Sequence, residues 1–195
     1  MKKLTIIGLV LFTLFSIVAT GFVKNTTKLP VPNQDSLLKR APDCIKMYYY
    51  IRAYADTFNI PHEYAFGVAY LETHYGGPLD STYNPRQRSY CGALGPMQIM
   101  PATAGLLEGK PVSKKKLRND VEYNVKLSMR LLRILYDKYG NWKLVFGAYN
   151  TGKPIVNNYA LKAFNYDIPW SSEEAKSSTE IYDISTYIGS MQTSD

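Results

Sequence analysis

YLETHYGG, residues 70–77, ends a predicted helix and places a carboxylate, Glu72, in its last turn. Pro61 stands where the first turn of a helix tolerates proline, and Gly76-Gly77-Pro78 stops the helix after residue 74. Three apolar residues precede Glu72 on the same helical face: Ala65, Val68 and Ala69. The sequence therefore predicts a glutamate that points into an apolar surface.

The predicted position of Glu72 penalises its ionised form twice. Burial removes water from the carboxylate, and the unpaired carbonyls at the end of a helix carry partial negative charge. Both effects raise the pKa, and a carboxyl that stays protonated near neutrality can serve as a general acid. Two other interpretations fit the pattern, a surface glutamate and a buried carboxylate paired with an arginine.

The rest of the chain indicates a mainly α-helical protein with little or no β-structure. Residues 120–139 keep apolar side chains at helical spacing and give the clearest amphipathic helix. Lys114-Lys115-Lys116 is interpreted as a solvated turn. Further helices are predicted at 45–58, at 142–149, at 155–164, from Pro101 onward, and from a capping box at Ser177 and Glu180 to about Met191.

The N-terminal region has the pattern of an export segment. Lys2 and Lys3 precede twenty residues, Leu4 to Val23, that carry no charge. Residues 1–23 are either a signal peptide or an N-terminal membrane anchor, and either places the remainder outside the cytoplasm, in the periplasm or cell envelope. Residues 24–43 contain prolines among polar residues and are predicted to be a linker, which leaves 44–195 as one domain.

Charge and cysteine content limit the function classes. The formal net charge is +7, but the lysines are dispersed and no nucleic-acid-binding motif is present, so nucleic acid is not an expected partner. An anionic envelope suits this charge, and so does simple solubility. Cys44 and Cys91 form either a disulfide or two free thiols. His62-Glu63 lacks the second histidine of a zinc motif, because Phe66 stands there, and no metal or cofactor is expected.

Three sequence blocks occur together in a familiar order: Glu72, then Gly92-Ala93-Leu94-Gly95-Pro96-Met97-Gln98-Ile99-Met100-Pro101, then Ala148-Tyr149-Asn150-Thr151-Gly152. Over residues 45–190 the chain resembles the soluble-lytic-transglycosylase-like (SLT-like) family, whose fold is lysozyme-like and helical. The resemblance implies that Glu72 is the catalytic acid/base. It also implies a set of substrate-binding residues: Thr73 in place of the usual serine, Ser89, Met97, Gln98, Tyr149 and Asn150. Asn124 matches an asparagine of the family's long helix.

The resemblance implies an enzyme that acts on peptidoglycan. It would cleave the β-1,4 bond between N-acetylmuramic acid and N-acetylglucosamine and leave a 1,6-anhydromuramoyl end. Residues 75–82 are an insertion relative to the family pattern, and Asp80 within them is either a turn residue or a second functional carboxylate. Two alternatives remain: hydrolysis as in goose-type lysozymes, with Asp80 activating water, and a non-catalytic glycan-binding envelope protein.

Overall fold

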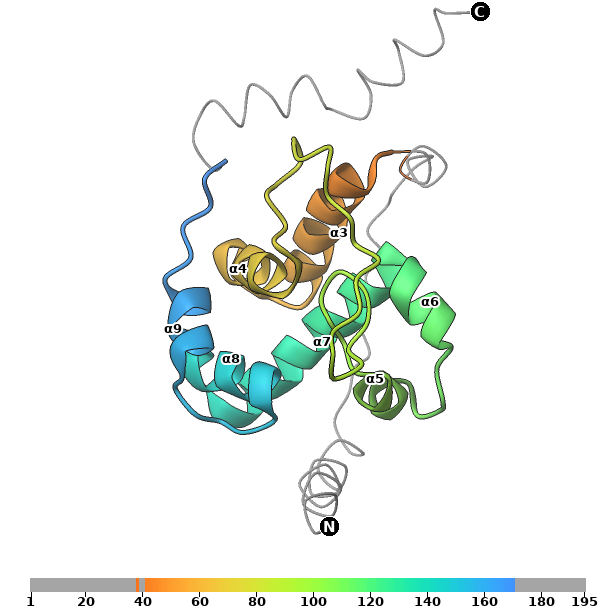
Figure 1. Cartoon of the computed structure of the whole chain (residues 1–195). Helices are drawn as coiled ribbons and strands as arrows, with labels where there is room; N and C mark the ends of the chain where they lie inside the picture. The colour runs from red at the N-terminus through yellow and green to blue at the C-terminus, as the bar shows by residue number, and fades with distance from the viewer. Residues whose placement is uncertain (1–37, 39–40, 171–195) are drawn as a thin grey trace, which may run out of the picture. The chain divides into compact units, whose positions relative to one another are not determined.

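A computed structural model describes residues 38 and 41–170 of the 195-residue chain (Figure 1). The predicted export segment at 1–23, most of the predicted linker, and the predicted helix from Ser177 to Met191 lie outside these residues and stay predictions. All described residues belong to one compact unit of the chain, Asn33–Asp195.

Seven helices and the irregular segments between them make up the described part of the chain. Its helices are α3 (Asp43–Thr57), α4 (His62–Thr73), α5 (Pro101–Glu108), α6 (Lys114–Asn119), α7 (Val121–Tyr139), α8 (Trp142–Thr151) and α9 (Asn158–Phe164). Within the same residues no strand is present, only isolated bridges from Arg88 to Leu94 and from Leu94 to Ile99. The predicted mainly α fold is confirmed. None of these helices is long and apolar enough to cross a membrane.

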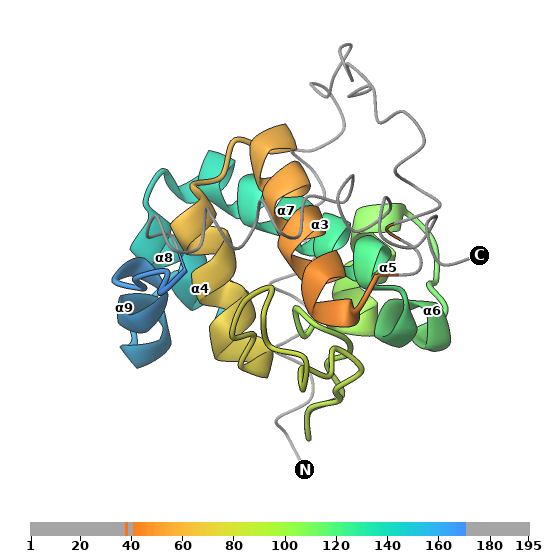
Figure 2. The same cartoon turned by 90° about the horizontal axis from the view of Figure 1, so that it is seen from above.

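Helix α7 is the element around which the others pack. Its N-terminus is capped by Asp120, whose carboxylate accepts from the Tyr123 amide at 3.0 Å. Helices α3, α5, α6 and α8 contact it along its length, as Figures 1 and 2 show. Its buried face is apolar except for Asn124 and Ser128. The periodicity that predicted this helix therefore also predicted its burial.

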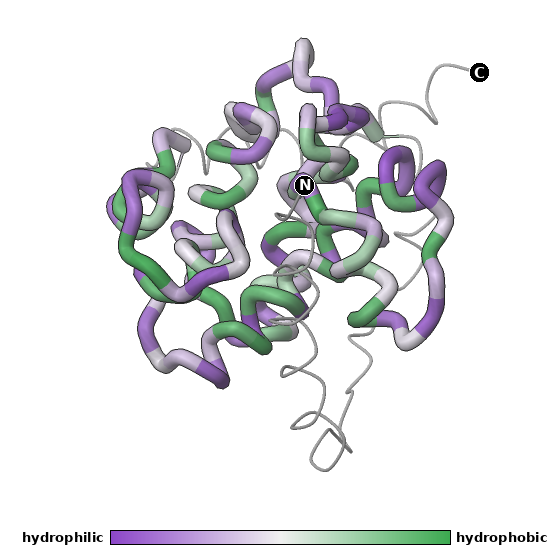
Figure 3. The backbone as a smooth tube through the Cα atoms, turned by 60° about the horizontal axis from the view of Figure 1, so that its bottom comes forward, coloured by the Kyte–Doolittle hydropathy of each residue, from purple (hydrophilic) through white to green (hydrophobic). Residues whose placement is uncertain are grey.

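Apolar side chains form two clusters on either side of α7. The larger joins α3, α4, α7, α8 and α9, and the smaller joins Leu94, Ile99, Ala104, Leu117 and Leu127. Figure 3 shows hydrophobic and hydrophilic residues alternating along the helices, as expected when one face of each helix is buried. The segment from Tyr75 to Met100, between α4 and α5, packs on this framework without regular secondary structure.

Two local predictions were wrong. Lys114-Lys115-Lys116 is the first half of α6, because Ser113 accepts from the Lys116 amide and Leu117 is fully buried as an anchor. The helix expected at 155–164 begins only at Asn158, where Asn157 accepts from the Ala160 amide at 2.8 Å. In both cases a polar capping residue determines where the helix begins.

The end of α4 differs in detail from its prediction. The helix ends at Thr73, and His74 takes the left-handed conformation with φ of 57°, donating its amide to the Tyr70 carbonyl at 2.8 Å. Gly77 also has positive φ, 108°, and the ring of Trp170 packs where a Cβ would lie. Glu72 is thus held in the last turn, as the sequence indicated.

Candidate active site

Glu72 lies partly buried at the end of α4 and has a neutral hydrogen-bond partner. The Tyr159 hydroxyl donates to Glu72 Oε1 at 2.6 Å. Burial raises the pKa of Glu72 from 4.5 to about 7, while the hydrogen bond from Tyr159 opposes this rise. The predicted upward shift of the pKa is confirmed, and the carboxyl can both give and take a proton near neutrality.

The packing of α9 against α4 brings Tyr159 to Glu72. Asn157 caps α9 and places Tyr159 in its first turn. Gly67 of α4 permits close approach, because a Cβ there would lie 2.9 Å from Tyr166 Cβ and 3.0 Å from the Ala163 carbonyl oxygen. The glycine thus permits close packing of α9 and the residues after it on α4.

Tyr149 lies near Glu72 but bonds elsewhere. Its hydroxyl donates to the Met97 carbonyl at 2.6 Å, which joins α8 to the loop before α5. Burial and the nearby charge of Glu72 raise the pKa of Tyr149, so its phenol stays protonated. Tyr149 is therefore a neutral donor beside the carboxyl, with its proton directed to the loop.

The loop Arg88–Met100 owes its shape to one buried amide. Asn124 is fully buried, accepts from the Met97 amide at 3.0 Å, and donates to the Leu94 and Leu117 carbonyls at 2.8 Å each. Gly95 has φ of 77°, and a Cβ there would lie 2.5 Å from the Asn124 side chain. The glycine and the asparagine together hold the turn that presents Gln98.

Gln98 and Met97 occupy different environments within this turn. Gln98 is partly buried, has φ of 50°, and donates its side-chain amide to the Gly95 carbonyl at 2.7 Å. Its side-chain oxygen has no protein donor in the described residues. Met97 is fully buried. Its backbone amide donates to Asn124 and its backbone carbonyl accepts from Tyr149, so the backbone of Met97 connects these two side chains.

Thr73 and Ser89 use their hydroxyl groups within the protein. Thr73 is 2% exposed, donates to the Pro96 carbonyl at 2.7 Å, and is hydrogen-bonded to the Tyr83 hydroxyl at 2.9 Å. Ser89 is partly buried, and its oxygen accepts from the Ala93 amide at 2.9 Å. Thr73 thus ties the end of α4 to the loop, and Ser89 closes the loop upon itself.

The structure gathers most of the predicted residues but adds one that the sequence analysis missed. Glu72, Tyr149 and Tyr159 lie together, and Met97 and Gln98 belong to the loop bonded to Tyr149. Asn150 is exposed and accepts from the Asn157 side chain at 3.3 Å, which links α8 to the cap of α9. The only sequence signal near Tyr159 is the capping residue Asn157, two positions before it. That residue indicates where a helix begins, but it does not indicate that Tyr159 contacts Glu72.

Comparison with known proteins identifies the family of this chain. The family model for transglycosylase SLT domains matches residues 49–169, more than half of the chain. The chain belongs to the transglycosylase SLT domain family. The predicted SLT-like resemblance is confirmed, and the matched region contains Glu72, the Arg88–Met100 loop, Tyr149 and Tyr159.

Two curated relatives show the extent of the similarity. The SLT domain is 31% identical over 113 residues to the soluble lytic murein transglycosylase of Escherichia coli (strain K12), covering 55% of this chain and 16% of that protein. It is 31% identical over 132 residues to the membrane-bound lytic murein transglycosylase C of Histophilus somni (strain 2336), covering 60% of this chain and 32% of that protein. The chain thus spans well under half the length of either relative.

Asp80 of the SLT domain forms a local turn. Its Oδ1 accepts from the Thr82 amide at 3.2 Å and from the Thr82 hydroxyl at 2.7 Å. These bonds form a turn within residues 75–82, the predicted insertion.

The cysteines of the SLT domain are both free thiols, Cys44 buried and Cys91 exposed. The disulfide considered from the sequence is not formed, since Cys44 lies inside the core on α3 and Cys91 lies in the exposed loop. Among the described residues, no group of three or more His, Cys, Asp or Glu side chains could hold a metal ion.

Proposed function

We propose that this chain is a peptidoglycan lytic transglycosylase in which Glu72 is the single acid/base. The observation that carries the proposal is the carboxyl of Glu72, which has a pKa of about 7 and a tyrosine as its partner and lies within the matched SLT domain. The family match and the relatives named as murein transglycosylases support the substrate class.

In the first step, Glu72 acts as general acid. It transfers its proton to the oxygen between N-acetylmuramic acid and N-acetylglucosamine, and the bond from C1 to that oxygen breaks. The acetamido group of the muramoyl unit supports the positive charge that develops at C1. Because the pKa of Glu72 is about 7, a large fraction of the enzyme is protonated near neutrality.

In the second step, the same group acts as base. The carboxylate of Glu72 takes the proton of the C6 hydroxyl, whose oxygen bonds to C1 and closes the 1,6-anhydro ring. Glu72 is protonated again and no water is consumed. Tyr159 donates to Oε1 throughout and stabilises the anionic form between the two steps.

The other residues divide into binding and positioning roles. Gln98 and Asn150 offer polar side chains for the sugar hydroxyl and acetamido groups, and the Ser89 hydroxyl retains a proton to donate. Thr73 and Met97 are buried, so they position the end of α4 and the loop rather than touch the sugar through their side chains. Tyr149 holds the loop beside the carboxyl.

We further propose that the enzyme acts outside the cytoplasm, at the cell wall. The basic surface and the uncharged run Leu4–Val23 fit an exported chain whose target is the cell wall, free or tethered to the membrane. One relative is named soluble and another membrane-bound, so related chains work in either form.

Mass spectrometry of peptidoglycan digests tests the function directly. Wild-type protein should release fragments lighter than the corresponding hydrolysis products by the mass of one water molecule, and Glu72→Gln should release none. Glu63→Gln, a change at an exposed position on the same helix, serves as the control and should remain active. Reducing ends from the wild type would establish hydrolysis, and Asp80→Asn would then be the next variant. An intact glycan with wild type and both variants would contradict the enzymatic proposal.

A further inference from the structure

A groove beside α6 carries a concentration of positive charge. Its volume is about 530 Å³, and four exposed cationic side chains line it: Arg88, Lys114, Lys115 and Arg118. No carboxylate is among the described residues of its lining, and none of the four cations forms an ion pair with a described carboxylate. Like charges gathered in a concave surface without counter-charges attract an anion.

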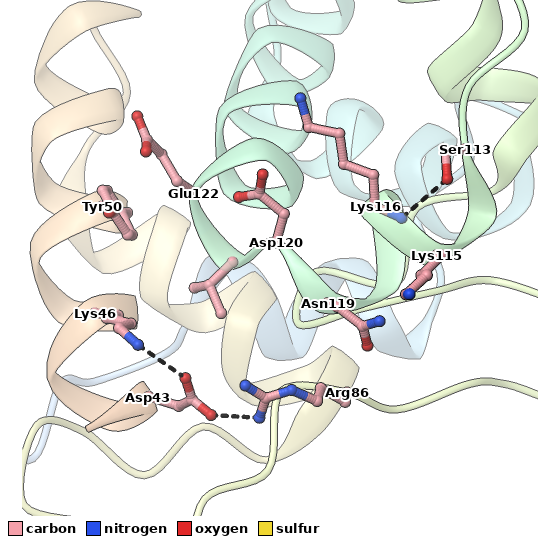
Figure 4. Close-up of a pocket in the computed structure, with 11 residues that line it drawn as sticks. Asp43, Lys46, Tyr50, Arg86, Ser113, Lys115, Lys116, Asn119, Asp120 and Glu122 are labelled. Atoms are coloured by element: carbon pink, nitrogen blue, oxygen red, sulfur yellow. Dashed lines mark hydrogen bonds and ion pairs between the residues drawn. The ribbon is translucent and has the colours of Figure 1, made fainter. Parts of the chain in front are cut away.

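A second cavity beside α6, which shares Lys115 and Asn119 with the groove, has a different charge composition. It is slightly larger, about 590 Å³, and Figure 4 shows that acidic and basic side chains meet within it. Asp43 pairs with Lys46 at 3.6 Å and with Arg86 at 2.5 Å, while Asp120 and Glu122 also line the cavity. Carboxylates thus accompany the cations of this cavity, Lys115 included, whereas Arg88, Lys114 and Arg118 line the groove alone.

The groove shares a wall with the candidate active site. Arg88, Cys91, Gly92, Leu94 and Met100 line it, and they belong to the same loop as Ser89 and Gln98. In Figures 1 and 2 this loop lies between α4, whose last turn carries Glu72, and α6, which carries the lysines.

The chemistry of peptidoglycan supplies an anion at this position. Its N-acetylated sugars are neutral, and the lactyl carboxyl of the muramoyl unit is consumed in the amide bond to the peptide stem. The nearest negative charges to the scissile bond are therefore the carboxylates of that stem. A muramoyl unit held at Glu72 can direct its stem across the Arg88–Met100 loop toward α6.

We propose that the groove lined by Arg88, Lys114, Lys115 and Arg118 is a subsite for the carboxylates of the peptide stem, an inference that rests on the proposed function. Arg118 Nε donates to the Arg86 carbonyl at 2.9 Å, and this bond holds the Arg118 side chain in place. The other three cations have no bond to a described residue and are free to meet the ligand. The enzyme therefore prefers glycan that carries peptide stems.

Cys91 allows occupancy of the groove to be measured without catalysis. It is an exposed free thiol in the lining, whereas Cys44, the other cysteine, is buried and serves as an internal reference. The full chain is alkylated with iodoacetamide in the presence of N-acetylmuramoyl-L-alanyl-D-glutamate, which has two carboxylates. The parallel probe is the same molecule with both carboxyls converted to amides, at equal ionic strength.

The dicarboxylate should slow alkylation of Cys91, and the diamide should not. The double variant Arg88→Gln/Lys114→Gln should weaken half-maximal protection about fivefold to tenfold, because exposed charge pairs each make a modest contribution. Lys126→Gln removes an equally exposed charge from α7, away from the groove, and should leave protection unchanged. Equal effects of the two probes, no protection by either, or protection that survives in the double variant would overturn the proposal.

A second measurement separates this inference from the proposed function. Wild type and the double variant are compared on peptide-bearing glycan and on glycan stripped of stems by an amidase. The expected result is a preference for peptide-bearing glycan that the double variant loses. Equal cleavage of both substrates by both proteins would contradict the subsite alone. Cleavage of neither, with thiol protection intact, would contradict the enzymatic function while leaving a carboxylate-binding groove.

Discussion

Replacing Glu72 by glutamine should stabilise the protein at alkaline pH. The pKa of Glu72 is about 7 in the folded protein, against 4.5 for an ordinary glutamate, and each pKa unit corresponds to about 1.4 kcal/mol. Between these two values the folded state binds more protons than the unfolded state, so the free energy of unfolding falls as pH rises. Above pH 7 the ionised carboxylate costs about 3 kcal/mol, and Glu72→Gln removes that cost.

Urea unfolding of wild type and Glu72→Gln at about pH 4.5 and about pH 8.5 measures the free-energy cost of the ionised carboxylate. Any pH-independent effect of the amide, including its bond to Tyr159, cancels when the two pH values are compared. The stability of the variant relative to wild type should rise by about 3 kcal/mol between them. Glu63→Gln, at the exposed start of the same helix, should change stability by no more than about 1 kcal/mol. A Glu72→Gln effect that is the same at both pH values would refute a destabilised carboxylate.

Three further variants test the site and its supports. Tyr159→Phe removes the bond that lowers the pKa of Glu72, so the alkaline decline of kcat/KM should move to higher pH; an unchanged profile would contradict that role. Asn124→Ala leaves one buried N–H and two carbonyls without partners and should lower unfolding free energy by about 3 to 5 kcal/mol, measured in urea, whereas a loss below about 1 kcal/mol would contradict the account. Gly147→Ala would place a Cβ 1.7 Å from the Ile155 carbonyl oxygen and should cost at least about 2 kcal/mol in the same assay, with lower activity because the displaced segment leads into α9.

The sequence predicted the fold where one periodic signal dominated. Helix α7 was expected at 120–139 and spans Val121–Tyr139, because its apolar residues repeat at helical spacing over five turns. The lysine-rich α6 was missed because three consecutive charged residues carry no periodic signal. Its single buried residue, Leu117, and its cap, Ser113, become informative only once packing is known.

In the candidate site, too, only the residues that stand in local sequence motifs could be predicted. Motif spacing identified Glu72, the loop with Gln98, and Tyr149, since these stand in contiguous blocks. Tyr159 lies 87 residues from Glu72 and stands in none of those blocks. Thr73 was expected to bind substrate but is 2% exposed, because the end of α4 is covered by the loop it is bonded to. Local sequence reports residue type, whereas exposure and partners depend on how distant elements pack.

The hydrogen-bond partner of Glu72 supports the proposed catalytic role over a purely structural one. A buried glutamate that supports the fold is paired with an arginine or lysine, which lowers its pKa and fixes it as an anion. The last turn of α4 has no basic residue, and Glu72 forms no ion pair with any described cation. Its partner is the neutral phenol of Tyr159, which burial keeps protonated. The hydrogen bond from this phenol favours the anion, but burial outweighs it and the pKa stays at about 7, so the carboxyl can both release and take up a proton near neutrality.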